Sequence, residues 1–352
     1  MTSKNTITEI NLIKGFAIIL VFIGHAATGT FLPRPSMYEF IVQFIYAFHM
    51  PVFFLISGFL SYKMINMNLK TEYFTFLKNK FSRLIIPFIT ISFITNILII
   101  VLKNLSGESI SLNTILEMLK TIFLFPETGV MGALWFLYTL FMLNLIAPLI
   151  AKAPLKVVLT FTLIINIFMP KGIHFLAISR ISFFLVYFFI GISIRKNYDN
   201  FKSSLNKNPI IIIVISIFTI SIYALILSNG LTLNPIILST YSFICGLLGS
   251  VLVSFIAYNL KNKKIIYYLD ILGKYSMDIY LFSWFFQMSS MIAVIFIFKV
   301  DNYMIFFLSN MLIGSLCLPF SILIIRKVNL FNLLFLGINH KKYPNSNELL
   351  PI

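Results

Sequence analysis

Long apolar runs separated by short polar segments make up most of the 352-residue chain. A helix that crosses about 30 Å of hydrocarbon needs about 20 mostly apolar residues. Ten such runs, of which the fifth and sixth are short, lie at residues 10–27, 41–62, 84–102, 133–150, 157–169, 183–194, 209–228, 236–257, 271–297 and 303–325. The pattern predicts an all-α fold, a polytopic membrane helix bundle of about ten transmembrane helices.

The composition supports this prediction and excludes a soluble globular protein. Hydrophobic residues make up 59% of the chain and charged residues only 11%, whereas about 25% are charged in soluble domains. The first run is interpreted as a retained helix and not as a cleaved signal peptide, because Glu9 lies in the region before it and no cleavage pattern follows. Cys245 and Cys317 both lie inside apolar runs and indicate neither a disulfide nor a metal site.

Basic residues outnumber acidic residues by 27 to 11, which gives a net charge of +16. Such an excess can indicate nucleic-acid binding, but these bases lie in short clusters between apolar runs. With ten spans, 20 of the 27 fall on the side that holds both termini and six on the opposite side. Because cytoplasmic loops are rich in lysine and arginine, we expect cytoplasmic termini, a multi-pass location in the cell membrane, membrane lipid as a partner and no nucleic acid.

No linker or internal repeat divides the chain, so we expect one integral-membrane domain over residues 1–330 and a short cytoplasmic tail over residues 331–352. The longest outer segment, about 103–132, contains an amphipathic stretch from Ser111 to Phe125. We expect this stretch to lie along the outer membrane interface.

Ionisable side chains at membrane depth are costly and are therefore candidates for function. Lys14 and His25 are eleven residues apart in the first run, which on a helix puts them on one side and about 16 Å apart along the axis. Gly15 and Gly24 flank them, as expected where this face packs closely on another helix. A snorkelling lysine and an interfacial histidine without a role are the alternative interpretations.

His49 lies in the second run, about 12 Å below the outer start of that run and two residues before Pro51. The proline removes a backbone hydrogen bond and can bend the helix. On consecutive antiparallel helices, His25 and His49 can approach each other and form a shared site. The alternative is a core histidine bonded to a backbone carbonyl. A metal is not expected, because no cluster of further ligand residues accompanies the pair.

Other polar positions carry weaker signals. Arg83 lies at the cytoplasmic mouth of the third run, where its guanidinium would suit phosphate. Trp135 begins the fourth run and could also belong to an interfacial aromatic belt. Asp278 follows Lys274 by four residues, and an ion pair at that spacing would explain it structurally. His174, in an outer loop, is interpreted as a solvated histidine.

Six stretches together resemble the membrane acyltransferase 3 family, and more closely its branch of fucose 4-O-acetylase-related acetyltransferases. They follow the family's order and are Asn11–His25, Phe48–Leu60, Lys80–Phe88, Ala133–Phe141, Phe183–Arg195 and Gly273–Leu281. The segment FHMPVFF with an upstream histidine is the most specific of them. Two positions depart from the family: the basic residue of the first helix, usually Arg, is Lys14, and the histidine that commonly follows IYL is replaced by Phe282.

The resemblance implies transfer of acetyl from cytoplasmic acetyl-CoA to a hydroxyl of a cell-surface or lipid-linked polysaccharide sugar. It implies no permanently bound cofactor, with acyl-CoA as the donor substrate and the glycan as acceptor. His25 would act as general base, and His49 would orient it, stabilise the oxyanion or carry a transient acyl group. Lys14 and Arg83 would hold the CoA phosphates, and Trp135 would meet the sugar. On composition alone, a polytopic transporter or flippase of a glycolipid or polysaccharide intermediate is the alternative.

Overall fold

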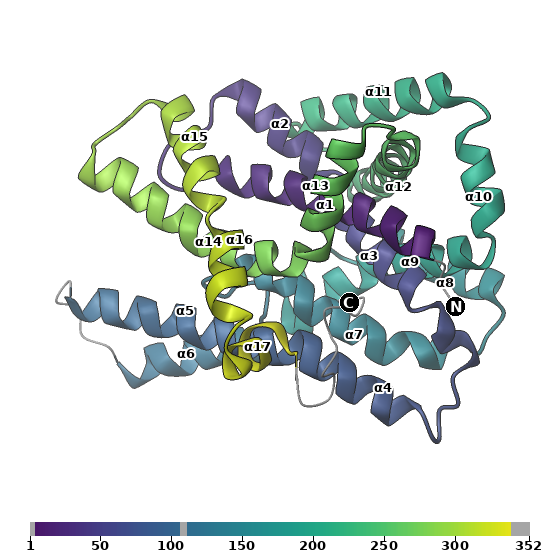
Figure 1. Cartoon of the computed structure of the whole chain (residues 1–352), viewed down its shortest axis with the longest axis horizontal. Coiled ribbons are helices and arrows are strands. Elements are labelled where there is room, and N and C mark those ends of the chain that lie inside the picture. The colour runs from purple at the N-terminus through teal and green to yellow at the C-terminus, as the bar shows by residue number, and fades with distance from the viewer. Residues whose placement is uncertain (1–3, 106–110, 339–352) are drawn as a thin grey trace. The chain divides into compact units, whose positions relative to one another are not determined.

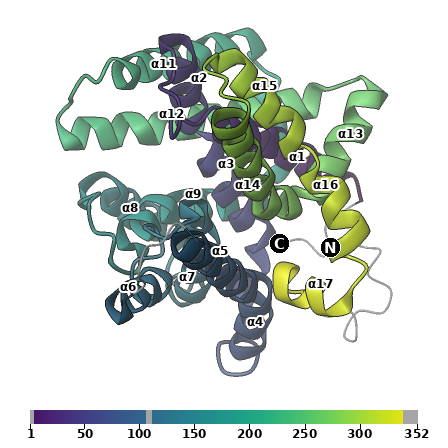
Figure 2. The same ribbon diagram turned by 90° about the vertical axis from the view of Figure 1, so that its left-hand side faces the viewer.

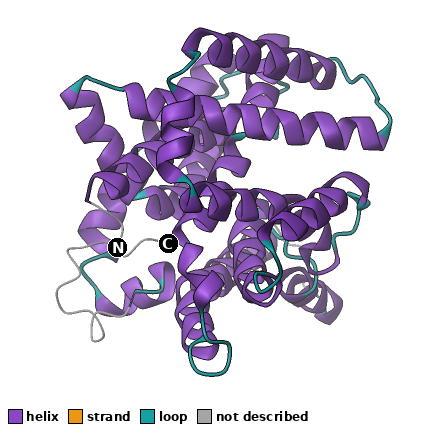
Figure 3. Cartoon of the chain, turned by 90° about the vertical axis from the view of Figure 1, so that its right-hand side faces the viewer, coloured by secondary structure: helices purple, strands orange, loops and turns teal. Residues whose placement is uncertain are grey.

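The computed structural model describes residues 4–105 and 111–338, which form helices joined by loops and contain no strand (Figure 3). The chain divides into two compact units. Unit 1 consists of Met1–Tyr62 and Tyr187–Ser321, and unit 2 consists of Lys63–Val186 and Ile322–Ile352. One long helix, α9 (Ile178–Lys196), contributes its first half to unit 2 and its second half to unit 1.

Unit 1 is built around its first helix. Its other helices are α2 (Ser36–Tyr46), α3 (His49–Leu60), α10 (Tyr198–Leu205), α11 (Pro209–Ser228), α12 (Pro235–Asn259), α13 (Lys263–Lys274), α14 (Ser276–Ile292), α15 (Tyr303–Gly314) and α16 (Cys317–Phe320). Helix α1 (Lys4–Ala26) contacts α3 and α12–α15, and α14 and α15 lie side by side (Figures 1 and 2). At Gly15 a Cβ atom would come within 2.3 Å of the carbonyl oxygen of Leu269, so α1 approaches α13 as closely as only glycine permits.

Unit 2 contains the helices α4 (Tyr73–Lys80), α5 (Ile86–Leu105), α6 (Leu112–Phe123), α7 (Trp135–Ile150), α8 (Leu155–Phe168) and α17 (Asn329–Leu336). A five-residue π-helical turn, Phe81–Ile85, joins α4 to α5. The C-terminal helix α17 packs on α5 (Figure 1). Helix α6 begins after Ser111, whose hydroxyl accepts from the N–H of Thr114 at 3.2 Å, and it covers most of the amphipathic stretch from Ser111 to Phe125.

The ten predicted runs correspond to ten helical segments of the described residues. Nine of them are long and apolar enough to cross a membrane, and the tenth, α8, is a shorter apolar helix. If ten spans cross the membrane in alternating directions, certain loops lie on the same side of it. Within each unit, loops predicted to lie on the same side contact each other. On the predicted outer side, the Tyr303 hydroxyl donates to the carbonyl of Thr28 at 3.2 Å, and Leu176 N–H donates to the carbonyl of Leu124 at 2.6 Å. The all-α, polytopic fold is confirmed.

The ninth predicted run differs from the prediction, because it contains a break. Helix α13 ends at Lys274 and α14 begins at Ser276, so Lys274 lies outside the span. The predicted ion pair between Lys274 and Asp278 is wrong, because the break at Tyr275 removes the helical spacing. Lys274 instead pairs with Asp270 one turn earlier at 2.6 Å, and the carboxylate of Asp278 accepts from the Ser321 hydroxyl at 2.5 Å.

Two segments expected to be loops contain helices. The cytoplasmic segment near 258–270 holds most of α13, and α17 extends into the predicted tail. The rest of that tail, residues 339–352, lies outside the described residues.

Candidate active site

The second predicted span is not one continuous helix, because it is interrupted just before His49. Helix α2 ends at Tyr46, and Phe48, with φ −143° and ψ −14°, separates it from α3, which begins at His49. Pro51 therefore falls in the first turn of α3, where a missing N–H breaks no helical hydrogen bond. The predicted bend is present, and it puts His49 at the start of a helix instead of within one.

The imidazole of His49 is buried, with 7% of the residue exposed, and it contacts the carbonyl oxygen of Ile45 through Nδ1 at 3.0 Å. A carbonyl oxygen can only accept, so Nδ1 carries the proton. In the neutral ring, Nε2 then holds a lone pair. The backbone contact expected of a purely structural histidine is present, but it occupies only one of the two ring nitrogens.

His25 lies near the end of α1 and is the second member of the pair. Its Nδ1 is buried and has no hydrogen-bond partner among the described residues. The two imidazoles are close enough to interact electrostatically. A buried polar atom without a partner costs about 1–3 kcal/mol, so it calls for an explanation such as a bound water, a ligand or a catalytic role. The structure thus brings His25 and His49 together, as predicted.

Tyr46 is a third member of this site, which the sequence analysis missed. Its ring lies over the ring of His49 with the centroids 4.9 Å apart, and its hydroxyl donates to the carbonyl of Gly24 at 3.3 Å. A Cβ atom on Gly24 would come within 2.5 Å of Cε1 of Tyr46. Gly24 therefore lets the tyrosine ring lie against α1 beside His25. The sequence carries a weak signal for this contact, the glycine directly before the histidine.

Lys14 lies on α1 slightly more than three turns before its end and is 7% exposed. Because α1 is one continuous helix, the predicted separation of about 16 Å from His25 along the axis holds. Close by, the side-chain amide of Asn11 donates to Asp270 at 2.9 Å. Lys14 thus belongs to the predicted cytoplasmic end of unit 1, and His25 to the opposite half of α1.

Arg83 belongs to unit 2 and sits in the middle of the π-helical turn between α4 and α5. Such turns are rare and are often found at functional sites. The end of α17 packs against this turn: the Ser82 hydroxyl donates to the carbonyl of Gly337 at 3.1 Å. Lys80 is within electrostatic reach of Arg83, so two cations lie on consecutive turns, an arrangement that suits phosphate groups.

Trp135 is the first residue of α7, also in unit 2. Its indole stacks on Phe184 with the ring centroids 5.4 Å apart, and the guanidinium of Arg180 lies over it, 4.6 Å from the ring centroid. Trp135 is thus part of an aromatic and charged cluster of its own unit. Arg83 and Trp135 are not placed relative to the histidines, which belong to unit 1.

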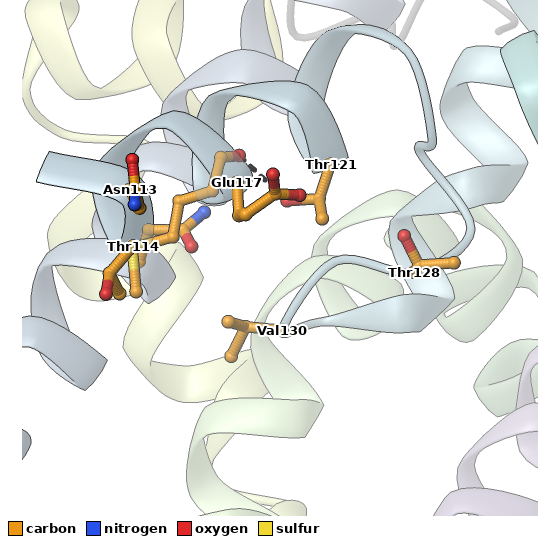
Figure 4. Close-up of a pocket in the computed structure, with 8 residues that line it drawn as sticks. Asn113, Thr114, Glu117, Thr121, Thr128 and Val130 are labelled. Atoms are coloured by element: carbon orange, nitrogen blue, oxygen red, sulfur yellow. Dashed lines mark hydrogen bonds between the residues drawn. The ribbon is translucent and has the colours of Figure 1, made fainter. Parts of the chain in front are cut away.

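A pocket of about 440 Å³ lies beside α6 in unit 2 (Figure 4). Its lining combines hydroxyl, amide and carboxylate groups with apolar surface and includes Asn113, Thr114, Glu117, Thr121, Thr128 and Val130. In the part of the chain that the structure covers, no three His, Cys, Asp or Glu side chains are grouped so that they could hold a metal.

The position after IYL, where the family commonly has a histidine, is structural in this chain. Phe282 is 3% exposed and packs on Phe320 with the ring centroids 5.6 Å apart.

The fold and this site define a multi-pass helical membrane protein with a histidine pair at depth. A family model described as an acyltransferase domain, that of acyltransferase 3, matches residues 7–326. The chain belongs to the acyltransferase 3 family and is a membrane acyltransferase. Neither the comparison with curated proteins nor the comparison with solved structures found a match.

Proposed function

We propose that this acyltransferase transfers acetyl from cytoplasmic acetyl-CoA to a hydroxyl of a cell-surface or lipid-linked polysaccharide sugar, with His25 as the general base. The observation that carries the proposal is the buried Nδ1 of His25, which no described residue satisfies, beside a second histidine of fixed tautomer. Histidine has an ordinary pKa of about 6.5 and can take up and release a proton near neutral pH.

In this mechanism His25 accepts the proton of the acceptor hydroxyl as its oxygen attacks the thioester carbonyl. The tetrahedral intermediate collapses: the C–S bond breaks, an oxygen ester remains on the sugar, and the CoA sulfur takes the proton from the imidazolium of His25. His49, whose Nε2 has a lone pair in the neutral ring and whose imidazole is within electrostatic reach of His25, would orient His25. Tyr46 acts as a positioning residue, because it contacts both His49 and the backbone beside His25.

The donor would be held by its phosphates near the cytoplasmic ends of the helices. Lys14 and Arg83 supply the charges, and the length of about 16 Å between Lys14 and His25 is within reach of a pantetheine arm. The replacement of the family's arginine by Lys14 keeps the charge but loses bidentate binding. Arg83, on its π-helical turn, would then carry most of the geometric recognition.

The test is acetyl transfer from labelled acetyl-CoA in purified, lipid-reconstituted protein and in cells whose surface polysaccharide is analysed for O-acetyl groups by NMR. We expect His25→Ala to abolish transfer while the variant inserts and melts normally, and His49→Ala to reduce it strongly. Full transfer by a correctly inserted His25→Ala variant would falsify the base assignment.

The alternative activity, a transporter or flippase, makes a different prediction for the same cells. Deletion of a transporter would remove or trap the glycan and leave the acetyl content of the remaining glycan unchanged. Membership of an acyltransferase family supports the transferase.

A further inference from the structure

A cluster of charged side chains lies at the predicted outer end of unit 2, where the loop before α7 meets the loop before α9. Glu127 is at its base, with 5% of its side chain exposed. Its Oε2 accepts from Nε of Arg180 at 3.0 Å and lies 3.4 Å from Nδ1 of His174. Its other oxygen, Oε1, is buried and has no hydrogen-bond partner among the residues described. His174, expected to be simply solvated, is thus part of a cluster.

Arg180 has two contacts in this cluster. Its guanidinium donates to Glu127 and also lies 4.6 Å from the ring centroid of Trp135. Lys171 is the second cation: its ammonium lies 4.8 Å from the ring centroid of Phe183. Lys171 and Arg180 are within electrostatic reach of each other. Lys171 forms no ion pair with a carboxylate of the described chain, so the single anion, Glu127, neutralises only one of the two cations.

Two cations held together at this place need an explanation. Lysine and arginine are depleted on the outer side of membrane proteins, and only six of the 27 basic residues fall there in this chain. Two of those six, Lys171 and Arg180, are within electrostatic reach of each other in this cluster. Neighbouring like charges are unfavourable unless an anion joins them. The backbone beside them is also strained, since Leu176 and Ala177 have φ values of 50° and 53°.

We propose that Lys171 and Arg180 bind an anionic group, a carboxylate or a phosphate, on a saccharide acceptor that packs against Trp135. The choice of a saccharide comes from the pocket of Figure 4, whose lining offers hydroxyl, amide and carboxylate groups beside the apolar Met118 and Val130. Thr128 of that pocket directly follows Glu127, so one loop contributes to both. The inference rests on the proposed function, and it narrows the acceptor from any glycan to an acidic one.

The binding test uses Trp135 as its own reporter. The chain has two tryptophans, so a Trp284→Phe background leaves only the fluorescence of Trp135. The full-length protein in phosphatidylcholine nanodiscs is titrated with glucuronate and with glucose 1-phosphate, with glucose as the neutral control. We expect a saturable change with at least one of the two acidic sugars and none with glucose.

Lys171→Gln and Arg180→Gln should each weaken that binding at least about tenfold, as expected for the loss of a charge-assisted contact. The matched control is Lys299→Gln, which removes a charge from a different outer loop and should leave binding unchanged. The proposal is overturned if neither acidic sugar changes the fluorescence, if glucose acts equally, or if Lys171→Gln binds like its parent. It is also overturned if inorganic phosphate binds as tightly as the acidic sugars, or if phosphatidylglycerol in the nanodisc occupies the site in their place.

This readout needs neither acyl-CoA nor turnover. Intact binding of an acidic sugar in a protein that transfers no acetyl would therefore contradict the proposed function alone. Acetyl transfer without any acidic-sugar binding would contradict this inference alone.

Discussion

Replacement of Gly24 by alanine tests whether the contact between α1 and Tyr46 matters for chemistry. The new Cβ would lie 2.5 Å from Cε1 of Tyr46, whereas carbon atoms pack at about 3.5–4.0 Å. The ring must therefore move by about 1 Å, away from α1. The hydrogen bond from the tyrosine hydroxyl to the Gly24 carbonyl, already 3.3 Å long, would break at a cost of about 0.5–1.5 kcal/mol.

The consequence for activity follows from the ring contact with His49, at 4.9 Å between centroids. A misplacement of about 1 Å near reacting groups can lower a rate by about 100-fold. We expect kcat of Gly24→Ala for acetyl transfer to fall by about 10- to 100-fold, with KM for acetyl-CoA nearly unchanged. Tyr46→Phe keeps the ring and loses only the hydroxyl bond, so its kcat should stay within a few-fold of the wild type.

The assay is steady-state transfer from labelled acetyl-CoA, paired with thermal melting of each variant in detergent. Gly15→Ala is the matched control, because its Cβ would meet a backbone oxygen, that of Leu269, at 2.3 Å. Backbone cannot swing aside as a side chain can, so Gly15→Ala should lower the melting temperature more than Gly24→Ala does. A well-folded Gly24→Ala variant with wild-type kcat would refute the positioning role of Tyr46.

Other perturbations have expected outcomes of their own. His25→Gln keeps a hydrogen-bonding side chain but no base, so transfer should fall by about 100- to 10,000-fold at an unchanged melting temperature; near-normal rates would remove His25 as the base. Arg83→Gln should raise KM for acetyl-CoA about tenfold or more and leave KM for the acceptor alone, and the reverse pattern would move Arg83 out of the donor site. Gly337→Ala should lower the melting temperature, because φ is +64° and its Cβ would lie 1.9 Å from the Ser82 carbonyl oxygen; an unchanged melt would contradict the packing of α17. Burial, and secondarily Arg180, lower the pKa of Lys171 to about 8, so the ammonium is charged below that pH and neutral above it; acidic-sugar binding should weaken about tenfold from pH 7 to pH 9, and the weakening should be absent in Lys171→Gln.

The spans could be predicted from the sequence because the thickness of the hydrocarbon fixes how long an apolar run must be. The break between α13 and α14 could not, since Lys274 and Asp278 have the spacing of a helical ion pair, which favours one continuous helix. The helix boundary at His49 was partly visible in Pro51. The backbone conformation of Phe48 determines that Tyr46 and His49 lie on the same side of this interruption. No local sequence pattern specifies that conformation.

The cluster around Glu127 was hidden for a different reason. Its members come from segments about 45–53 residues apart, and the charge count assigned Lys171 and Arg180 only to a side of the membrane. That count was nevertheless useful, because it identified the cations that topology does not explain. The structure adds the carboxylate and the indole that hold them.

Several buried polar side chains of the helices satisfy themselves locally. Ser57, Thr95, Asn96, Asn144 and Ser250 each donate to the carbonyl four residues earlier, at 2.6–3.0 Å. Such residues need neither a partner helix nor a ligand, so polarity at depth is by itself a poor sign of function.

Ionisable side chains have a stricter requirement, because one backbone carbonyl cannot satisfy both nitrogens of an imidazole. His49 uses the Ile45 carbonyl for Nδ1 and keeps Nε2 for another group. His25 has no described partner at Nδ1 at all. Two imidazoles within electrostatic reach of each other, each with a ring nitrogen that its own helix does not satisfy, are the physical basis of the proposed proton-handling site.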